Sequence, residues 1–201
     1  MSVDQEVRGG GAAAGWPEPF RYSPDGAGDP EPPYAVADAW APPHPLALPE
    51  GLCYRLRAAA LCAPLRGLSD TGTYLTVDLD PGDEQQILDR IRAANAAWWG
   101  LEVSEWLLMG KSYRPGDQHA EHQDVYAGAA RRKLGAIVQL SDPAEYRGGA
   151  LRVRVGAGTV ELPRALGTLA AWPGWTLHGV EPVTAGERQV LAIFGYGPAL
   201  R

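Results

Sequence analysis

The spacing of apolar residues changes near residue 100 of this chain. Before that point, apolar side chains recur every three or four positions in two stretches, which is the period of an amphipathic helix. The first stretch covers residues 49–62 and begins with Pro49, a residue that suits the first turn of a helix. We predict a helix there, with an apolar face made of Leu52, Leu56, Ala59 and Ala60.

The second stretch, residues 80–100, has helix signals at both ends. Asp80 is a suitable N-cap, acidic residues follow it in the first turn, and Gly100 stands where a helix commonly ends. We predict a second helix here. Its apolar face is formed by Ile87, Ile91, Ala94 and Trp98.

Beyond residue 100, apolar and β-branched residues occur in short runs separated by Gly, Pro and Asp. Such runs predict strands, and no helix-length pattern interrupts them, which disfavours a doubly wound parallel sheet. The pattern favours a mainly β protein with N-terminal helices (α+β), built as a β-sandwich or jelly roll. The predicted strands cover residues 103–110, 133–140, 150–155, 158–162, 167–172 and 188–196.

Composition divides the chain into two parts. Residues 1–33 are rich in Gly, Ala, Pro and Asp and have little aliphatic patterning, so we predict a flexible lead that cannot form a core of its own. Residues 34–201 are predicted to form a single domain. Within it, residues 49–100 supply helical support and residues 101–197 supply the β core.

Charge and cysteine content restrict the class of protein. The 201 residues carry a formal net charge of −6, which gives no electrostatic support for a nucleic-acid or membrane partner. No apolar run approaches the roughly 20 residues that span a bilayer, and the N-terminus has no secretory-signal pattern. Two cysteines without CxxC spacing exclude a disulfide framework. We expect a soluble cytoplasmic protein with reduced thiols, and the sequence gives no indication of its oligomeric state.

Two of the four histidines lie in the segment HAEHQDVY, residues 119–126. In a strand, His122 and Asp124 would project to one face, where His178 from a later strand could join them. Two imidazoles and one carboxylate are the ligands of the non-haem Fe(II) facial triad, whereas the HExxH helix of zinc hydrolases is absent. An HxD pair alone is common by chance. We interpret His119 as a surface or pocket-lining residue.

Three segments together resemble a known family. They are YRPGDQHAEHQDVY, RRKLGAIVQLSDPAEYRGGALRV and LHGVEPVTAGERQVLAIFGY, and they fall within residues 100–197. In sequence and in order they resemble Fe(II)/2-oxoglutarate-dependent dioxygenases of the prolyl-4-hydroxylase-like type. This resemblance implies a double-stranded β-helix (jelly roll) core.

The resemblance also implies a set of site residues. His122, Asp124 and His178 would bind Fe(II) and form the catalytic centre. Arg188 would bind the C5 carboxylate of 2-oxoglutarate, a task that suits the guanidinium fork.

Two further residues are implied as cosubstrate contacts. Tyr113 occupies a position where relatives often carry a tyrosine near 2-oxoglutarate, although it could equally serve core packing. Gln139 stands near a position where many relatives have a second tyrosine, and it would replace that hydrogen bond. The implied cofactors are Fe(II), 2-oxoglutarate as cosubstrate, and O2, with ascorbate as a further candidate.

The implied reaction converts 2-oxoglutarate to succinate and CO2 and hydroxylates an unactivated C–H bond; desaturation, epoxidation or ring formation would use the same residues. Asp124 disfavours halogenation, because related halogenases carry a small residue in its place. As the substrate we expect a small molecule, such as an amino acid or a natural-product intermediate. The alternatives are a residue of a protein or peptide (prolyl-type), or a jelly-roll protein that binds metal without turnover. The basic run 131–133 is interpreted as a solvated turn, and Trp175 as a candidate lining residue of the pocket.

Overall fold

The computed structural model describes residues 48–62, 65–69, 72–77, 79–126, 129–155 and 157–199. The predicted flexible lead at residues 1–33 and the N-terminal part of the predicted domain up to residue 47 lie outside the described residues. No helix among the described residues is long and apolar enough to cross a membrane.

Both predicted helices are present. Helix α1 spans Glu50–Cys62 and α2 spans Pro81–Trp98. The Asp80 side chain accepts a hydrogen bond from the Gly82 amide (2.9 Å), and Gly100 follows the helix with a φ of +60°, so both end signals of α2 are confirmed.

The predicted apolar face of α2 was wrong at its last position. Trp98 is 44 % exposed, whereas Trp99 packs against the core. The helix ends at Trp98, and the backbone of Trp99 is no longer helical (φ −124°, ψ −29°). The helical spacing of apolar residues therefore does not extend to Trp99, the tryptophan that packs against the core.

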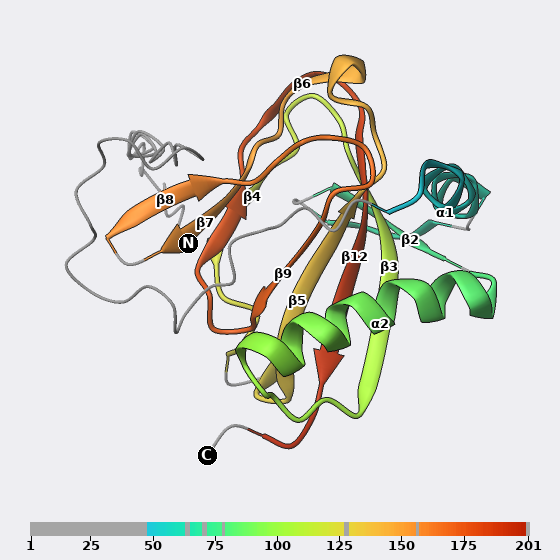
Figure 1. The fold of residues 1–201 in the computed structure, drawn as a ribbon. Coiled ribbons are helices and arrows are strands. Elements are labelled where there is room, and N and C mark those ends of the chain that lie inside the picture. The colour runs from blue at the N-terminus through green and yellow to red at the C-terminus, as the bar shows by residue number, and fades with distance from the viewer. Residues whose placement is uncertain are drawn as a thin grey trace, which may run out of the picture.

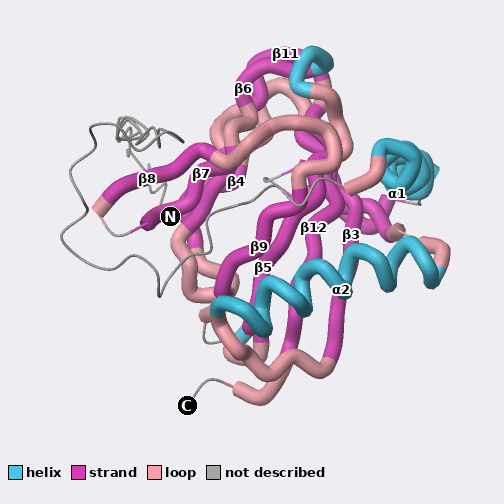
Figure 2. The backbone as a smooth tube through the Cα atoms, in the orientation of Figure 1, coloured by secondary structure: helices cyan, strands magenta, loops and turns pink. Residues whose placement is uncertain are grey.

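Twelve strands of the described residues form three antiparallel sheets (Figures 1 and 2). The major sheet has the order β1-β2-β3-β12-β5-β9, the minor sheet has the order β4-β10-β7-β8, and a two-stranded sheet pairs β11 with β6. The strand bounds of the major sheet are β1 Leu65–Ser69, β2 Gly72–Thr76, β3 Glu105–Tyr113, β12 Arg188–Tyr196, β5 Arg132–Gln139 and β9 Leu169–Pro173. Those of the other two sheets are β4 His119–His122, β10 His178–Val180, β7 Leu151–Val155, β8 Gly158–Glu161, β11 Val183–Gly186 and β6 Tyr146–Gly148.

Two of the strands that were not predicted lie within residues 49–100, which were expected to be helical support. β1 and β2 lie between α1 and α2 in the chain and extend the major sheet beyond β3. Each has only five residues, and LRGLS and GTYLT contain no sustained apolar alternation. β2 pairs with β3 and β1 pairs with β2, and the local sequence of these strands does not encode either contact.

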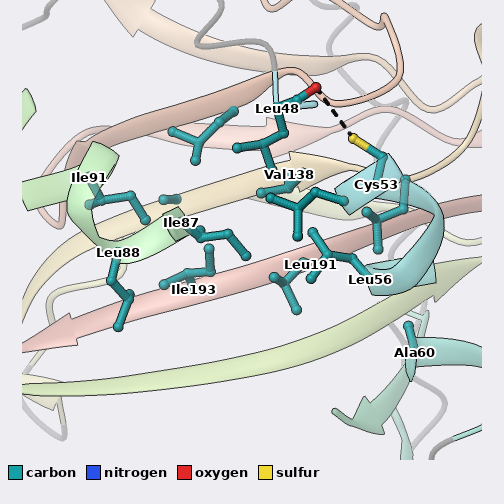
Figure 3. Packing of buried hydrophobic residues seen from close by; sticks show 14 of the residues in the cluster. Leu48, Cys53, Leu56, Ala60, Ile87, Leu88, Ile91, Val138, Leu191 and Ile193 are labelled. Atoms are coloured by element: carbon teal, nitrogen blue, oxygen red, sulfur yellow. Dashed lines mark hydrogen bonds between the residues drawn. The ribbon is translucent and has the colours of Figure 1, made fainter. Parts of the chain in front are cut away.

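The two helices cover one face of the major sheet. Figure 1 shows α2 crossing the strands, and Figure 3 shows side chains of both helices meeting those of β5 and β12. The buried residues between the helices and the sheet form an outer cluster, which is mainly aliphatic and includes Leu52, Leu56, Ile87, Ile91, Leu134, Val138, Leu191 and Ile193. Cys53 of α1 also lies within it, and its thiol donates to the Leu48 carbonyl oxygen (3.8 Å). Burial raises the pKa of the Cys53 thiol above its ordinary value.

The opposite face of the major sheet packs against the minor sheet. Ile137, Trp172 and Val190 from the major sheet form one buried cluster with Leu151 and Val153 from the minor sheet. Two facing antiparallel sheets with helices outside the larger one make a jelly roll, so the predicted fold class is confirmed.

Candidate active site

The structure brings His122, Asp124 and His178 together between the two sheets. One potential ligand atom of each lies within 4.8 Å of those of the other two, and they are the one such three-residue group among the described residues. His122 and His178 are cross-strand partners on β4 and β10, with ring centroids 4.4 Å apart. His122 Nε2 lies 3.8 Å from Asp124 Oδ1, and His178 Nε2 lies 3.8 Å from Asp124 Oδ2.

Both histidines present the same ring nitrogen to the cluster. The Nδ1 of His122 lies 2.8 Å from the Ala120 carbonyl oxygen, and the Nδ1 of His178 lies 2.9 Å from the Thr176 carbonyl oxygen. A carbonyl oxygen only accepts, so each Nδ1 carries the proton and donates it. The Nε2 lone pairs are therefore left facing Asp124, in the tautomer that metal ligation requires.

The reason given from the sequence for the His122–Asp124 contact was wrong, although the contact exists. Strand β4 ends at His122, and Asp124 lies in a bend beyond it, so strand alternation does not place the two side chains. Instead, the amides of Asp124 and Val125 both donate to the Gly174 carbonyl oxygen, at 2.8 and 3.1 Å. The loop after β9 therefore holds the backbone of Asp124.

Burial disfavours charge on the neighbouring imidazoles. It lowers the pKa of His178, against the opposing attraction of Asp124. Burial, followed by repulsion from Lys111, lowers the pKa of His119 to about 3. His119 stacks on His122 with ring centroids 3.9 Å apart, and Lys111 Nζ lies 3.2 Å from its Nδ1. It lines the site, as expected, and is not part of the three-residue group.

Arg188 begins β12 and is 1 % exposed. Among the described residues, none of its three guanidinium nitrogens has a hydrogen-bond partner. A buried, unpaired guanidinium is costly, and a carboxylate is the ligand that its planar fork fits best. Gly149 makes room for it, because a Cβ at Gly149 would lie 3.1 Å from Arg188 Cδ. The position is thus suited to an anion.

The other two predicted cosubstrate residues flank Arg188 on neighbouring strands. Tyr113 is its direct cross-strand partner on β3, with the guanidinium carbon 5.3 Å from the ring centroid. Gln139 on β5 pairs with Val190, two residues along from Arg188 and so on the same face of the sheet. The buried Gln139 Oε1 also has no hydrogen-bond partner among the described residues.

Three residues around Asp124 were missed or misread from the sequence. Trp172 Nε1 donates to Asp124 Oδ2 (3.3 Å), and Gly135 lies so close to both groups that a Cβ there would clash with them. The solvated turn predicted at 131–133 holds for the exposed Arg131 but was wrong from Arg132 onward. Arg132 begins β5, stacks 4.2 Å over the Phe194 ring, and lies 3.8 Å from Asp124 Oδ1. All three contacts join distant segments, so only the glycine in an apolar strand was available as a local signal.

Residues 108–196 match the sequence profile of the 2OG-Fe(II) oxygenase superfamily. By this match the segment is similar to members of that superfamily. It contains every site residue predicted from the sequence, and the superfamily's name gives the metal and cosubstrate, Fe(II) and 2-oxoglutarate, that the resemblance had implied.

Curated relatives align with part of this chain. A "PKHD-type hydroxylase" of Sphingopyxis alaskensis is 40 % identical over 87 residues, which are 41 % of this chain and 40 % of that relative. One of Shewanella baltica is 32 % identical over 113 residues, or 52 % of this chain and 49 % of the relative. The chain thus spans half or less of the length of these relatives.

Solved structures of 2OG oxygenases share the fold. A Pseudomonas putida prolyl-4-hydroxylase superposes with a TM-score of 0.63 at 21 % identity, covering 74 % of this chain and 88 % of that one. A Trichoplax adhaerens prolyl hydroxylase, in complex with a hypoxia inducible factor peptide fragment, gives 0.60 at 14 % identity, covering 74 % and 80 %. The resemblance to the prolyl-4-hydroxylase-like type is confirmed, with the jelly roll as the shared fold.

Proposed function

We propose that this protein is an Fe(II)- and 2-oxoglutarate-dependent oxygenase that hydroxylates a C–H bond. The observation that carries the proposal is a three-ligand group on the same side of the sheet as the buried Arg188 guanidinium, which has no hydrogen-bond partner within the described part of the chain. Two imidazoles and a carboxylate suit Fe(II) with positions left open, and Arg188 suits the distal carboxylate of a dicarboxylic acid.

In this proposal His122, Asp124 and His178 hold the metal. The bound metal, 2-oxoglutarate and O2 supply the oxidising chemistry, which gives succinate and CO2 and places one oxygen atom in a substrate C–H bond. The chain contributes binding and orientation. The backbone carbonyls of Ala120 and Thr176 fix the two imidazole tautomers, and Asp124 balances the cation's charge.

The cosubstrate would lie along β12. Arg188 would bind its C5 carboxylate in bidentate fashion, and Tyr113 and Gln139 would border it from the two adjacent strands. The neighbouring inner cluster, with Ile137 and Val190, keeps water from this ion pair and so strengthens it.

The first test is an anaerobic titration of the metal-free protein with Fe(II) and then 2-oxoglutarate. We expect a weak visible charge-transfer band, which should be lost in His178→Ala. His119→Ala is the matched control, because its ring stacks on His122 without joining the ligand group, and it should keep the band. An iron-loaded wild type without the band contradicts the proposal. Loss of the band in His119→Ala reassigns the ligand set.

For the substrate, a residue of a protein or peptide now takes precedence over the small molecule expected from the sequence. Two of the structurally similar solved proteins are a prolyl-4-hydroxylase and a prolyl hydroxylase in complex with a peptide fragment. In this chain, Tyr126 (61 % exposed) and Trp175 (40 % exposed) stand on the two loops that adjoin Asp124 and His178. Exposed aromatic rings suit extended peptide segments. Tyr126 also lines a pocket together with Ala129, Ala130, Arg131, Arg132 and Tyr196.

The substrate class is decided by parallel assays with short proline-containing peptides and with free amino acids. A peptide substrate should stimulate succinate release and gain one oxygen atom by mass. Stimulation by free amino acids alone would restore the small-molecule assignment. Metal binding without succinate from any substrate or from 2-oxoglutarate alone would favour the non-catalytic alternative.

A further inference from the structure

Of the three candidate metal ligands, Asp124 is contacted by several side chains that are not themselves candidate ligands. Its side chain is 2 % exposed, and each of its oxygens faces a different imidazole. A carboxylate in this position can donate one or both oxygens to a metal. An open facial triad requires it to occupy one position only, so that three remain for cosubstrate and O2.

Trp172 binds one of those two oxygens. Its indole Nε1 donates to Asp124 Oδ2 at 3.3 Å, and the ring lies 4.7 Å from the His178 ring. Trp172 is 3 % exposed within the inner cluster, and its indole N–H is a donor only. The indole is therefore held in one place by packing, and its hydrogen bond directs the carboxylate.

Gly135 supplies the space for this contact. It is the cross-strand partner of Trp172 on β5, and a Cβ there would overlap Asp124 Oδ2 and lie 2.7 Å from Trp172 Nε1. Any larger residue would separate the indole from the carboxylate or move both. The same β9 segment continues to Gly174, whose carbonyl oxygen binds the Asp124 amide.

We propose that Trp172 is the positioning residue of the metal centre: its indole N–H holds Asp124 Oδ2 and presents Oδ1 to the metal. Gly135 permits this arrangement, and Arg132, 3.8 Å from Oδ1, adds positive charge on the other side. The inference rests on the proposed function, in which Asp124 is a metal ligand. It adds a residue that sets the geometry of that ligand without touching the metal.

The test is the affinity for Co(II), measured by equilibrium titration of the metal-free protein. Trp172→Phe keeps an aromatic ring and removes the N–H, so Co(II) should bind about 10- to 100-fold more weakly. Gly135→Ala should weaken binding in the same direction. Trp99→Phe is the matched control, because Trp99 packs against the outer cluster and its Nε1 has no partner among the described residues. Its affinity should equal that of the wild type.

A second measurement tests the hydrogen bond itself in the absence of metal. In the metal-free protein labelled with 15N-tryptophan, one indole N–H signal should move upfield in Asp124→Ala. This readout does not depend on whether Trp172→Phe folds.

The outcomes separate the two proposals. Wild-type affinity in folded Trp172→Phe, or indole signals that do not respond to Asp124→Ala, would overturn the role of Trp172 and leave the proposed function standing. Equal Co(II) binding by the wild type and Asp124→Ala would overturn the metal site, and the positioning role with it.

Discussion

The two faces of the major sheet differ in the kind of side chain that they bury: aliphatic side chains on one face, and polar as well as apolar side chains on the other. On β5, Leu134, Ala136 and Val138 point outward into the aliphatic cluster beneath the helices. The alternate residues, Gly135, Ile137 and Gln139, point inward toward the minor sheet and the candidate site. One strand therefore serves two environments, as its two-residue period allows.

The outer face is built for stability and the inner face for binding. Apolar burial outside contributes roughly 1.5–3 kcal/mol per large side chain. Inside, the buried Arg188 guanidinium and the Gln139 carbonyl lack hydrogen-bond partners among the described residues, which costs free energy until a ligand pairs with them. The inner face thus differs from the outer face in holding buried polar groups that a ligand could pair with, beside its own packed cluster.

The largest effect should come from the inner face. Asp124→Ala removes the carboxylate shared by both imidazoles, so succinate formation should fall below detection. The metal-free variant should still fold, because the carboxylate is part of neither buried apolar cluster, and circular dichroism checks this. Turnover at the wild-type rate in this variant would remove Asp124 from the site.

The outer face should show the reverse behaviour. Leu191→Ala opens a cavity in the helix-covered cluster and should lower the free energy of unfolding by about 2–5 kcal/mol, measured by urea titration. Activity per folded molecule should persist. The control is Leu107→Ala, where the side chain is 41 % exposed and the loss should be much smaller. Equal losses at both positions would contradict the assignment of the core.

Arg188→Met tests whether the inner face is optimised for its ligand. With Mn(II) present, 2-oxoglutarate at 100 times its Kd should stabilise the wild type by about 2.7 kcal/mol, and this stabilisation should disappear in the variant. The ligand-free variant should be no less stable than the wild type, because an unpaired buried charge has been removed. Undiminished stabilisation by 2-oxoglutarate would place its carboxylate elsewhere.

The smallest effect concerns the ion pair between α1 and α2. Arg55 donates to both carboxylate oxygens of Asp83 at 2.6 Å, and this hydrogen bonding lowers the pKa of Asp83 below its ordinary value. The ionised form is thus favoured in the folded state, so the stabilisation is complete above the ordinary carboxyl pKa. It is lost as the pH falls through the lowered one.

Asp83→Asn should therefore be slightly less stable than the wild type at neutral pH and equally stable in strong acid. Urea titrations across this pH range measure the difference. A difference that grows toward acid would reverse the predicted sign.

The local features of this protein were available from the sequence. The hydrogen bond of the Asp80 cap joins residues two apart, and Gly100 adopts its positive φ just after α2, so both follow from short-range chemistry. The short apolar runs after residue 100 gave six of the strands, since alternation is a property of the strand itself. The sequences of the segments that contain His122, His178 and Arg188, together with their order along the chain, indicated the resemblance to the dioxygenase family.

The tertiary structure alone decided the rest. Strand β2, with β1 beside it, is positioned by pairing with β3. Asp124 is positioned by hydrogen bonds with Gly174 and Trp172 rather than by strand alternation. Arg132 stacks on the Phe194 ring. The Trp172–Asp124 hydrogen bond joins residues 48 apart in the chain. Such contacts depend on how the strands pair and face one another, and no local pattern encodes a partner that distant.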